Sequence, residues 1–328
     1  MNTNPHVSII ILNYNGKHYL ADCIRSVLSQ KTKKTFEVIV VDNASTDNSL
    51  QEIQTQEAFS TIRTLALPSN LGFAKANNSA TEIASGTYLV FLNNDTIVDP
   101  HWLEELIKPL EENDTIGLST PKVLLANSDP VKVQNAGIAV FSEGFARDRG
   151  AVVGSGIEDY EIDSEYFENS QEVHAACGVS LCIRKKLFDR LGGFDEGYFM
   201  YYEDVDLSLR ARLLGYGVMY CPKATLRHMH AASSKVASPF FIKHTEYSHL
   251  YFVLSFFPLT TIVQTFFLHA LFIVSAFRGM VLGTGTASVM GIRIQLLLKA
   301  VLYLPFVVSK RFFRKQKYSF ATLYATFY

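Results

Sequence analysis

Four short apolar runs rich in β-branched residues recur in the first part of the chain, and they limit its fold more than any other feature. Runs of this length without polar alternation are typical of strands buried on both faces of a sheet. Stretches with apolar residues at helical spacing separate them, and this alternation predicts a mainly parallel sheet with right-handed crossovers. We therefore predict an α/β fold, a mixed but mainly parallel sheet flanked by helices. The expected strands are Val7–Leu12, Phe36–Val41, Ile62–Leu67 and Tyr88–Leu92.

The predicted helices lie between and after these strands. Ser45 or Thr46 is a suitable N-cap for the second helix, and Asp99 followed by Pro100 is a typical opening for the fourth. The expected helices are Tyr19–Gln30, Asp47–Phe59, Phe73–Ala84 and a helix from Asp99 through Glu112.

Two acidic residues directly follow predicted strands. Asp42 comes after the second strand, and Asp95 lies in the turn Asn93-Asn94-Asp95 after the fourth. Ligands of parallel sheets bind outside the carboxyl ends of the strands. Either acid alone would be interpreted as a turn or capping residue, but two in Asn-rich turns of one sheet favour a shared site. The sequence has no GxGxxG after the first strand and no GxxxxGK[ST], so dinucleotide dehydrogenases and P-loop proteins are disfavoured.

A series of segments, in order over about residues 7–234, resembles the family 2 glycosyltransferases, which have the GT-A (Rossmann-like) fold. The subgroup that it most resembles includes rhamnosyltransferases and other bacterial surface-glycan enzymes. One position departs from the family pattern, because Asn93 stands where the DxD motif has its first Asp. The matching segments are Val7–Asn15, Val38–Asp47, Asn70–Asn77, Asn93–Asp95, Gly192–Glu196, Tyr202–Leu207 with Arg210, and His228–His230.

The resemblance implies inverting, metal-dependent transfer of a sugar from a nucleotide-diphosphate donor. Mg²⁺ or Mn²⁺ would neutralise the diphosphate, with Asp95 as its main ligand and His228 or His230 as the second. Strand alternation places both histidines on one face and leaves the choice between them open. By the same resemblance Asp42 accepts a hydrogen bond from the pyrimidine ring, which favours a uridine or thymidine donor. The residues expected to bind the nucleotide are Asn13, Asp42, Asn70, Gly72, Asn77 and Asn94.

A second acidic group, Glu203-Asp204, precedes a predicted helix over Val205–Leu214. Carboxylates in such a loop can be partly desolvated and act as a base, and the family pattern favours Asp204 over Glu203 as the catalytic residue. The alternative is that these acids only stabilise a helix N-terminus. Asp206 and Arg210 have the spacing of a helix-face ion pair. The stretch Gly144–Glu172 is expected to be a flexible loop over the acceptor cleft.

The last third of the chain differs from the rest in charge. The first 246 residues contain 31 Asp and Glu and 22 Lys and Arg, whereas residues 247–328 contain 8 Lys and Arg and no acid. No charged residue occurs from Tyr247 to Phe277, and Ile294–Ser309 is a second apolar stretch. The cluster Lys310–Lys317 mixes basic and aromatic residues, which suits an anionic membrane surface. The alternative to membrane attachment is a buried helical subdomain or a dimer interface. If this region does attach to a membrane, the sequence fits both a membrane span and helices that lie in the membrane plane. The apolar stretches that flank the basic cluster disfavour nucleic acid as its partner.

Four cysteines without a CxxC pair exclude a disulfide scaffold and disfavour a zinc knuckle. We find no signal peptide pattern at the N-terminus, and we expect the catalytic part on the cytoplasmic face of a bacterial inner membrane. The expected parts are a nucleotide-sugar-binding half (1–125), an acceptor-binding and catalytic half (126–246) and a helical, membrane-associated region (247–328). The predicted activity is hexosyl transfer from dTDP-rhamnose or a UDP-sugar to a glycan or lipid-linked glycan in surface polysaccharide synthesis. A non-catalytic nucleotide-sugar-binding or scaffold protein is the alternative.

Overall fold

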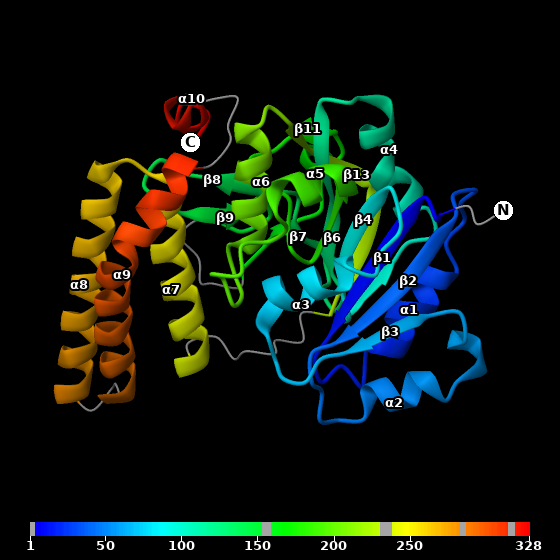
Figure 1. Ribbon diagram of the computed structural model, residues 1–328, viewed down its shortest axis with the longest axis horizontal. Helices are drawn as coiled ribbons and strands as arrows, with labels where there is room; N and C mark the ends of the chain where they lie inside the picture. The colour runs from blue at the N-terminus through cyan, green and yellow to red at the C-terminus, as the bar shows by residue number, and fades with distance from the viewer. Residues whose placement is uncertain (1–3, 153–158, 230–237, 283–286, 314–318) are drawn as a thin grey trace.

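The computed structural model describes residues 4–152, 159–229, 238–282, 287–313 and 319–328 (Figure 1). Within these residues, eleven strands form one mixed sheet, and β8 and β9 form a separate hairpin. Four parallel strands lie side by side in the order β4-β1-β2-β3, and the predicted strands are confirmed. Asn13 is opposite Asp42 and Leu12 is opposite Asn93, so the carboxyl ends of three strands meet at one edge. The strands are β1 (Val7–Asn13), β2 (Phe36–Asp42), β3 (Arg63–Ala66) and β4 (Tyr88–Asn93).

The second half of the sheet brings later segments to the same edge. β12 runs antiparallel between β4 and β6, and β13 runs parallel to β6 and antiparallel to β5. The β13–β5 register pairs His228 with Thr96, the residue after Asp95. The strands are β5 (Thr96–Val98), β6 (Ile116–Leu125), β7 (Lys132–Asn135), β8 (Ile138–Val140), β9 (Ala146–Asp148), β10 (Glu161–Ile162), β11 (Gln171–Glu172), β12 (Ser180–Arg184) and β13 (Gly217–His228).

Much of the stretch expected to be a flexible loop, residues 144–172, is therefore paired. Its described residues include β9, β10, the 3₁₀ turn η2 (Glu165–Phe167) and β11, while residues 153–158 lie outside the described part. Gly and polar residues here mark tight turns between short strands.

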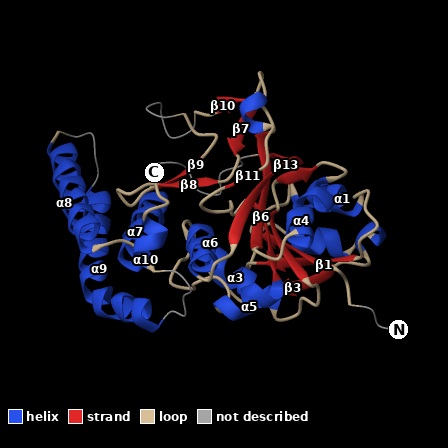
Figure 2. Ribbon diagram, turned by 90° about the horizontal axis from the view of Figure 1, so that it is seen from above, coloured by secondary structure: helices blue, strands red, loops and turns tan. Residues whose placement is uncertain are grey.

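Helices cover both faces of the sheet, which lies between them in Figure 2. Along β1, Val7, Ile9 and Ile11 point to the core that contains α1 and α4, whereas Ile10 points to the core of α3 and α5. This burial on both faces explains why the runs lack polar alternation. The helices are α1 (Leu20–Leu28), α2 (Ser49–Gln54) with the 3₁₀ turn η1 (Glu57–Phe59), α3 (Gly72–Thr81), α4 (Trp102–Glu112), α5 (Lys185–Leu191) and α6 (Glu203–Leu213).

Two predicted helix starts are wrong. The residue that precedes α2 is Asn48, because Ser45 and Thr46 instead bond to Asn15 of the neighbouring loop. The fourth helix begins at Trp102, after His101, rather than at Asp99. There the Asp99 carbonyl accepts the Trp102 N–H in a turn (3.0 Å).

The last part of the chain forms four helices among the described residues. α7 lies between the sheet domain and α9, and α8 is outermost (Figure 1). α7 is tied to the sheet domain, since Ser248 donates to the Met200 carbonyl (2.8 Å) and Tyr251 donates to Asp195 (3.2 Å). These bonds cross the expected boundary at residue 246, and the three-part division stays a prediction. The helices are α7 (Pro239–Phe256), α8 (Leu259–Val281), α9 (Ala287–Phe313) and α10 (Phe320–Tyr324).

Gly72 joins the two halves at a close backbone contact. Its φ is +79°, and a Cβ atom there would lie 2.3 Å from the Phe199 carbonyl oxygen, which accepts the Phe73 N–H (2.7 Å). Gly192 has a similar φ of +77° but open space around its Cβ position.

Substitution of these two glycines separates backbone strain from the close contact. We expect Gly192→Ala to lower the free energy of unfolding by about 1 kcal/mol, the cost of positive φ alone. Gly72→Ala adds a clash with the Phe199 carbonyl and should cost on the order of 3 kcal/mol. Urea denaturation followed by circular dichroism measures both. Equal losses in the two variants would show that the contact with Phe199 does not matter.

Candidate functional site

Asn13, at the end of β1, holds the strand ends together. Its side chain is fully buried and donates to Asp42 Oδ1 and Ser49 Oγ (both 2.8 Å). Its side-chain oxygen Oδ1 accepts from the Asn94 side-chain amide (2.7 Å). The nearby Gly16 makes room for this pair, because a Cβ there would lie 2.0 Å from Asn94 Nδ2. Asn13 thus joins Asp42 and Asn94, two other residues expected to bind the nucleotide.

Asp42 is 5% exposed and also stabilises the turn that follows β2. Its Oδ2 accepts the Ser45 N–H (3.0 Å), as the turn-forming interpretation expects. Each carboxylate oxygen has two lone pairs, so both retain an acceptor position. The turn and a hydrogen bond from a ligand N–H are therefore compatible.

The loop before α3 is braced by a residue that the sequence interpretation missed. Asn43 donates to Asn70 Oδ1 (2.9 Å) and accepts the Leu71 N–H (2.8 Å), and Asn70 in turn accepts the Gly72 N–H (3.0 Å). Asn70 and Gly72 therefore shape this loop and its contact with residue 199. Asn77 is buried in α3 and donates to the Phe73 carbonyl, and its Oδ1 has no hydrogen-bond partner among the described residues.

Asp95 and His228 face each other across the β5–β13 pair. His228 Nε2 lies 3.0 Å from Asp95 Oδ1, and both residues are buried. His228 Nδ1 bonds to Gln134 Oε1 (2.7 Å), so with the amide oriented this way Nδ1 carries the proton of a neutral ring. Nε2 then presents a lone pair to a carboxylate oxygen, an arrangement that needs a cation or a proton between them.

This arrangement fits a divalent cation held by two protein ligands. Diphosphate oxygens and water can fill its remaining positions, as Mg²⁺ and Mn²⁺ prefer. Among the described residues, no group of three or more metal-ligating side chains occurs. Gln134, which orients the imidazole, was missed, because β7 contains mainly polar residues and nothing in its sequence marks Gln134 as buried. The other candidate ligand, His230, lies outside the described residues.

The acceptor-side acids lie in the first turn of α6 and not in a loop before it, which corrects the prediction. Asp204 accepts the N–H groups of Gly178 (2.6 Å) and Val205 (2.7 Å). Burial raises the pKa of Asp204 to about 6, although these two hydrogen bonds lower it. Glu203 is 4% exposed, and its Oε2 has no hydrogen-bond partner in the described part of the chain. Burial and the charge of Asp204 hold the pKa of Glu203 well above its ordinary value.

The backbone before α6 is strained, and the helix behind it is firmly held. Tyr201 and Tyr202, neither a glycine, have φ of 69° and 67°. Such conformations persist where the surroundings fix them, and they occur often at functional sites. The predicted Asp206–Arg210 pair is confirmed as a buried ion pair. Tyr198 donates to the other Asp206 oxygen (3.4 Å).

Asp148, at the end of the β8–β9 hairpin, is a third acid of this site that the sequence interpretation missed. Its Oδ1 accepts from Asn135 (2.8 Å). Its pKa is raised to about 6, chiefly by burial and further by the negative charge of Asp204. The Asn135 hydrogen bond and His228 act in the opposite direction. The pKa of Asp148 therefore responds to the charges of both Asp204 and His228, which indicates that its carboxyl lies near both groups. The prediction of a loop over residues 144–172 hid this position.

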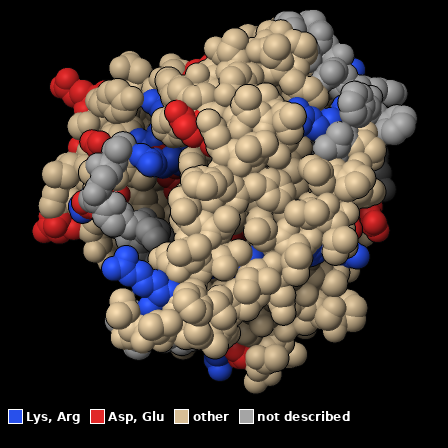
Figure 3. Space-filling model, turned by 90° about the vertical axis from the view of Figure 1, so that its left-hand side faces the viewer, with Lys and Arg blue, Asp and Glu red and all other residues tan. Residues whose placement is uncertain are grey.

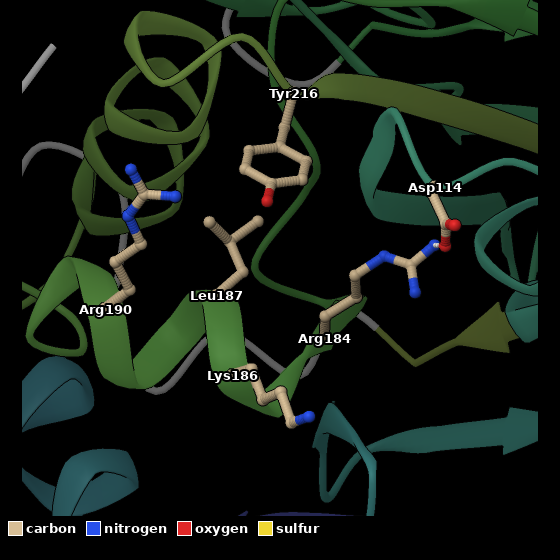
Figure 4. Close-up of a pocket in the computed structure, with 6 residues that line it drawn as sticks. All are labelled: Asp114, Arg184, Lys186, Leu187, Arg190 and Tyr216. Atoms are coloured by element: carbon tan, nitrogen blue, oxygen red, sulfur yellow. Dashed lines mark ion pairs between the residues drawn. The ribbon is translucent and has the colours of Figure 1, made fainter. Parts of the chain in front are cut away.

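A separate hollow of about 320 Å³ lies at the opposite edge of the sheet, near the start of β4 (Figure 4). The Arg184 guanidinium beside it forms an ion pair with Asp114 (3.4 Å) and donates to backbone carbonyls, including that of Ile116 (3.0 Å). Its lining residues are Asp114, Arg184, Lys186, Leu187, Arg190 and Tyr216. We assign no function to this hollow.

This sheet, with polar groups at the carboxyl ends of its strands, is the architecture of the GT-A glycosyltransferases. Residues 8–192 match the model of glycosyl transferase family 2, and the chain belongs to this family. A crystal structure of GalNAc-T7 with UDP, GalNAc and Mn²⁺ covers 96% of this chain and 59% of its own, with a TM-score of 0.63 at 14% identity. The mannosyltransferase PcManGT from Pyrobaculum calidifontis, with GDP-Man and Mn²⁺, covers 99% and 80%, with a TM-score of 0.51 at 17% identity.

Similar curated proteins include enzymes of bacterial glycan synthesis. The O-antigen biosynthesis protein RfbC of Myxococcus xanthus is 32% identical over 70% of this chain, which is 18% of that longer protein. The N-acetylglucosaminyl-diphospho-decaprenol L-rhamnosyltransferase of Mycobacterium tuberculosis is 26% identical over 69% of this chain and 76% of the relative. The chain thus matches about a fifth of the length of the first relative and three quarters of the second.

The Asp148–Asp204 interaction predicts a pH effect. A base must be unprotonated, so kcat/KM should fall as the pH drops through about 6 in the wild type. Asp148→Asn removes one of two like charges that oppose each other's ionisation, and it should move this acid limb to lower pH. Asp159→Asn, which alters an acid paired with Lys132 outside the site, is the matched control and should leave the limb in place. An unchanged limb in Asp148→Asn would contradict the interaction.

Proposed function

We propose that this family 2 glycosyltransferase inverts the sugar's anomeric configuration and depends on a divalent cation. One observation carries the proposal: Asp95 and His228 face each other 3.0 Å apart at the end of the sheet. Asp204, a half-buried carboxylate with a raised pKa, lies on the acceptor side of the same site. A single base suits one direct displacement, which inverts configuration.

On the donor side, the residues at the strand ends bind and orient the nucleotide. Asp42 keeps acceptor positions for an imide N–H, and Asn13 holds its carboxylate in place. Asp95 and His228 would hold Mg²⁺ or Mn²⁺, which would supply positive charge to neutralise the departing diphosphate. Gln134 holds the His228 ring so that Nε2 points to Asp95.

On the acceptor side, Asp204 takes the proton of the attacking hydroxyl. Two backbone N–H groups fix its orientation, and a pKa of about 6 leaves it ionised at neutral pH. Glu203 is a less suitable base, because burial and the charge of Asp204 raise its pKa and disfavour its ionised form. This difference favours Asp204, as the family pattern does.

The donor is a pyrimidine nucleotide sugar, dTDP-rhamnose or a UDP-sugar, and the acceptor is a glycan or lipid-linked glycan. The free acceptor positions of Asp42 suit the imide N–H of uridine or thymidine. The L-rhamnosyltransferase among the relatives supports rhamnose, and the O-antigen protein supports surface polysaccharide synthesis. α8 and α9 are long and apolar enough to enter a membrane, by length and composition only. They support a location on the cytoplasmic face of a bacterial inner membrane.

A transfer assay with a panel of nucleotide sugars on bacterial membranes tests the proposal. A dTDP- or UDP-sugar should give product, excess chelator should abolish it, and Mn²⁺ or Mg²⁺ should restore it. Asp204→Asn keeps the size of the side chain but not its basicity, so kcat should fall by ~10²–10⁴-fold while donor binding, measured by thermal shift, stays close to wild type.

Glu203→Gln is the matched control and should retain most of the turnover, because burial disfavours the ionised form of Glu203 and Gln keeps its size. If Glu203→Gln is inactive and Asp204→Asn is active, the base is Glu203. Full activity in chelator would contradict the metal. Donor binding without any transfer, by any member of the panel, would favour the non-catalytic alternative.

A further inference from the structure

α8 and α9 form one side of the molecule, and its surface is apolar. Figure 3 shows this side as a broad face with Lys, Arg, Asp and Glu mainly at its margin. Contiguous apolar surface of this extent marks an interaction site. The residues on the outer side, each at least 39% exposed, are Leu259, Val263, Phe267, Leu271, Val274, Phe277 and Val281 of α8, and Ile294, Leu298, Val301, Leu302, Tyr303 and Phe306 of α9.

The polarity of α8 is the reverse of that of a surface helix in water. Thr261, Thr265 and His269 are buried on its inner side, 2–4% exposed, whereas Phe267 on its outer side is 66% exposed. A helix at a protein–water boundary places its apolar side inward. The outer side of α8 is therefore matched to a hydrocarbon environment.

The helices lie flat against the domain and do not project from it. In Figures 1 and 2, α8 and α9 run alongside α7, which separates them from the sheet domain. Arg293 of α9 pairs with Glu246 of α7 (2.7 Å), and Lys310 pairs with Asp195 of the sheet domain (3.2 Å). If the hairpin crossed a bilayer, α7 and these ion pairs would lie at hydrocarbon depth, which is costly. Length alone would permit a span, since the 23 residues of α8 reach about 34 Å.

We infer that the outer side of α8 and α9 docks into one leaflet of a lipid bilayer with both helix axes in the membrane plane. This inference deepens the proposed function and rests on it for the nature of the acceptor. A chain of ring contacts leads from the segment before α6 to the inner side of α8: the ring centroid of Tyr202 lies 5.9 Å from that of His249 in α7, which lies 5.5 Å from that of His269. Only α7 thus separates this segment from the membrane-docked helix α8, which fits a lipid-linked acceptor that stays in the membrane.

The basic residues contribute less to docking than the sequence suggests. Lys310, expected at the membrane surface, binds Asp195 and the Tyr251 hydroxyl (2.9 Å). Arg311 donates to the Phe257 carbonyl at the end of α7 (2.8 Å), and Arg293 pairs with Glu246. These three side chains hold the protein together, whereas Arg278 of α8 and Lys299 of α9 are exposed, and residues 314–318 lie outside the described part. Apolar burial should contribute more to binding than these charges, so binding should weaken only modestly with added salt.

Depth-resolved fluorescence quenching tests the in-plane orientation on the full chain. The four native cysteines are buried, so a fluorophore can be placed on Leu259→Cys, Phe267→Cys or Val281→Cys, at the start, middle and end of α8. The vesicles contain phosphatidylethanolamine, phosphatidylglycerol and phospholipids brominated at different acyl depths. All three labels should report a similar shallow depth, and a label on Glu57→Cys should report none.

Other patterns would overturn the inference. A label at residue 267 near the bilayer centre, with those at 259 and 281 near opposite surfaces, would mean a span. Labels that the vesicles do not quench, in a protein whose mass doubles in light scattering, would mean a dimer interface. Unquenched labels in a monomer would mean that this face meets no membrane.

A charge introduced on the apolar face tests membrane docking independently of the sugar-transfer reaction. Phe267→Asp should weaken flotation with the same vesicles at least about tenfold. The substitution removes a large ring that docking would bury in the lipid, and it adds a charge there. Ile162→Asp is the matched control, an exposed apolar residue on β10, and should float as wild type does. Both should transfer to a soluble acceptor at the wild-type rate, so a failure of docking is distinguishable from a failure of the proposed function. Unchanged flotation of Phe267→Asp would overturn the docking face.

Discussion

The hydrogen bond from the buried Asn13 amide to the Asp42 carboxylate is the contact on which the site depends most. It joins the carboxyl ends of β1 and β2, and Asn13 Oδ1 extends the same network to Asn94 in the turn after β4. A buried polar group left without a partner costs about 1–3 kcal/mol, so these three strand ends are held as a unit. The turn that bears Asp95 therefore starts from a fixed point, and the β13–β5 register brings His228 to it.

The acceptor half is held by contacts from much farther along the chain. Gly72 lets the loop before α3 approach the Phe199 carbonyl, which connects the donor half to the strained segment before α6. α7 then supports this segment from behind through Met200 and Asp195, and α9 supports it through Lys310. The helices that form the apolar face are thus part of the framework of the site. Removal of residues 247–328 would delete buried residues such as Phe252, whose ring packs against Tyr202, and would leave their partners uncovered. Point substitutions are therefore the sharper test of membrane docking.

The sequence predicted the parts of the structure that depend on local patterns. The strands that carry Asp42 and Asp95 followed from uninterrupted apolar runs, and the Asp206–Arg210 pair followed from helical spacing. Long-range contacts were not predictable in this way. Asp148 joins Asp204 only through the fold of the β8–β9 hairpin, and Gln134 meets His228 across 94 residues. Lys310 suggested a membrane surface because its partner, Asp195, lies 115 residues away in the chain.

The central claim is that Asp95 and His228 bind a divalent cation together with the nucleotide diphosphate. Electron paramagnetic resonance of Mn²⁺, with and without UDP or dTDP, measures this directly. The wild type should immobilise Mn²⁺ only when the nucleotide is present, and Asp95→Asn should weaken this binding at least about tenfold. Asp204→Asn, on the acceptor side, should bind Mn²⁺ as the wild type does. Nucleotide-dependent Mn²⁺ binding that survives unchanged in Asp95→Asn would contradict the claim.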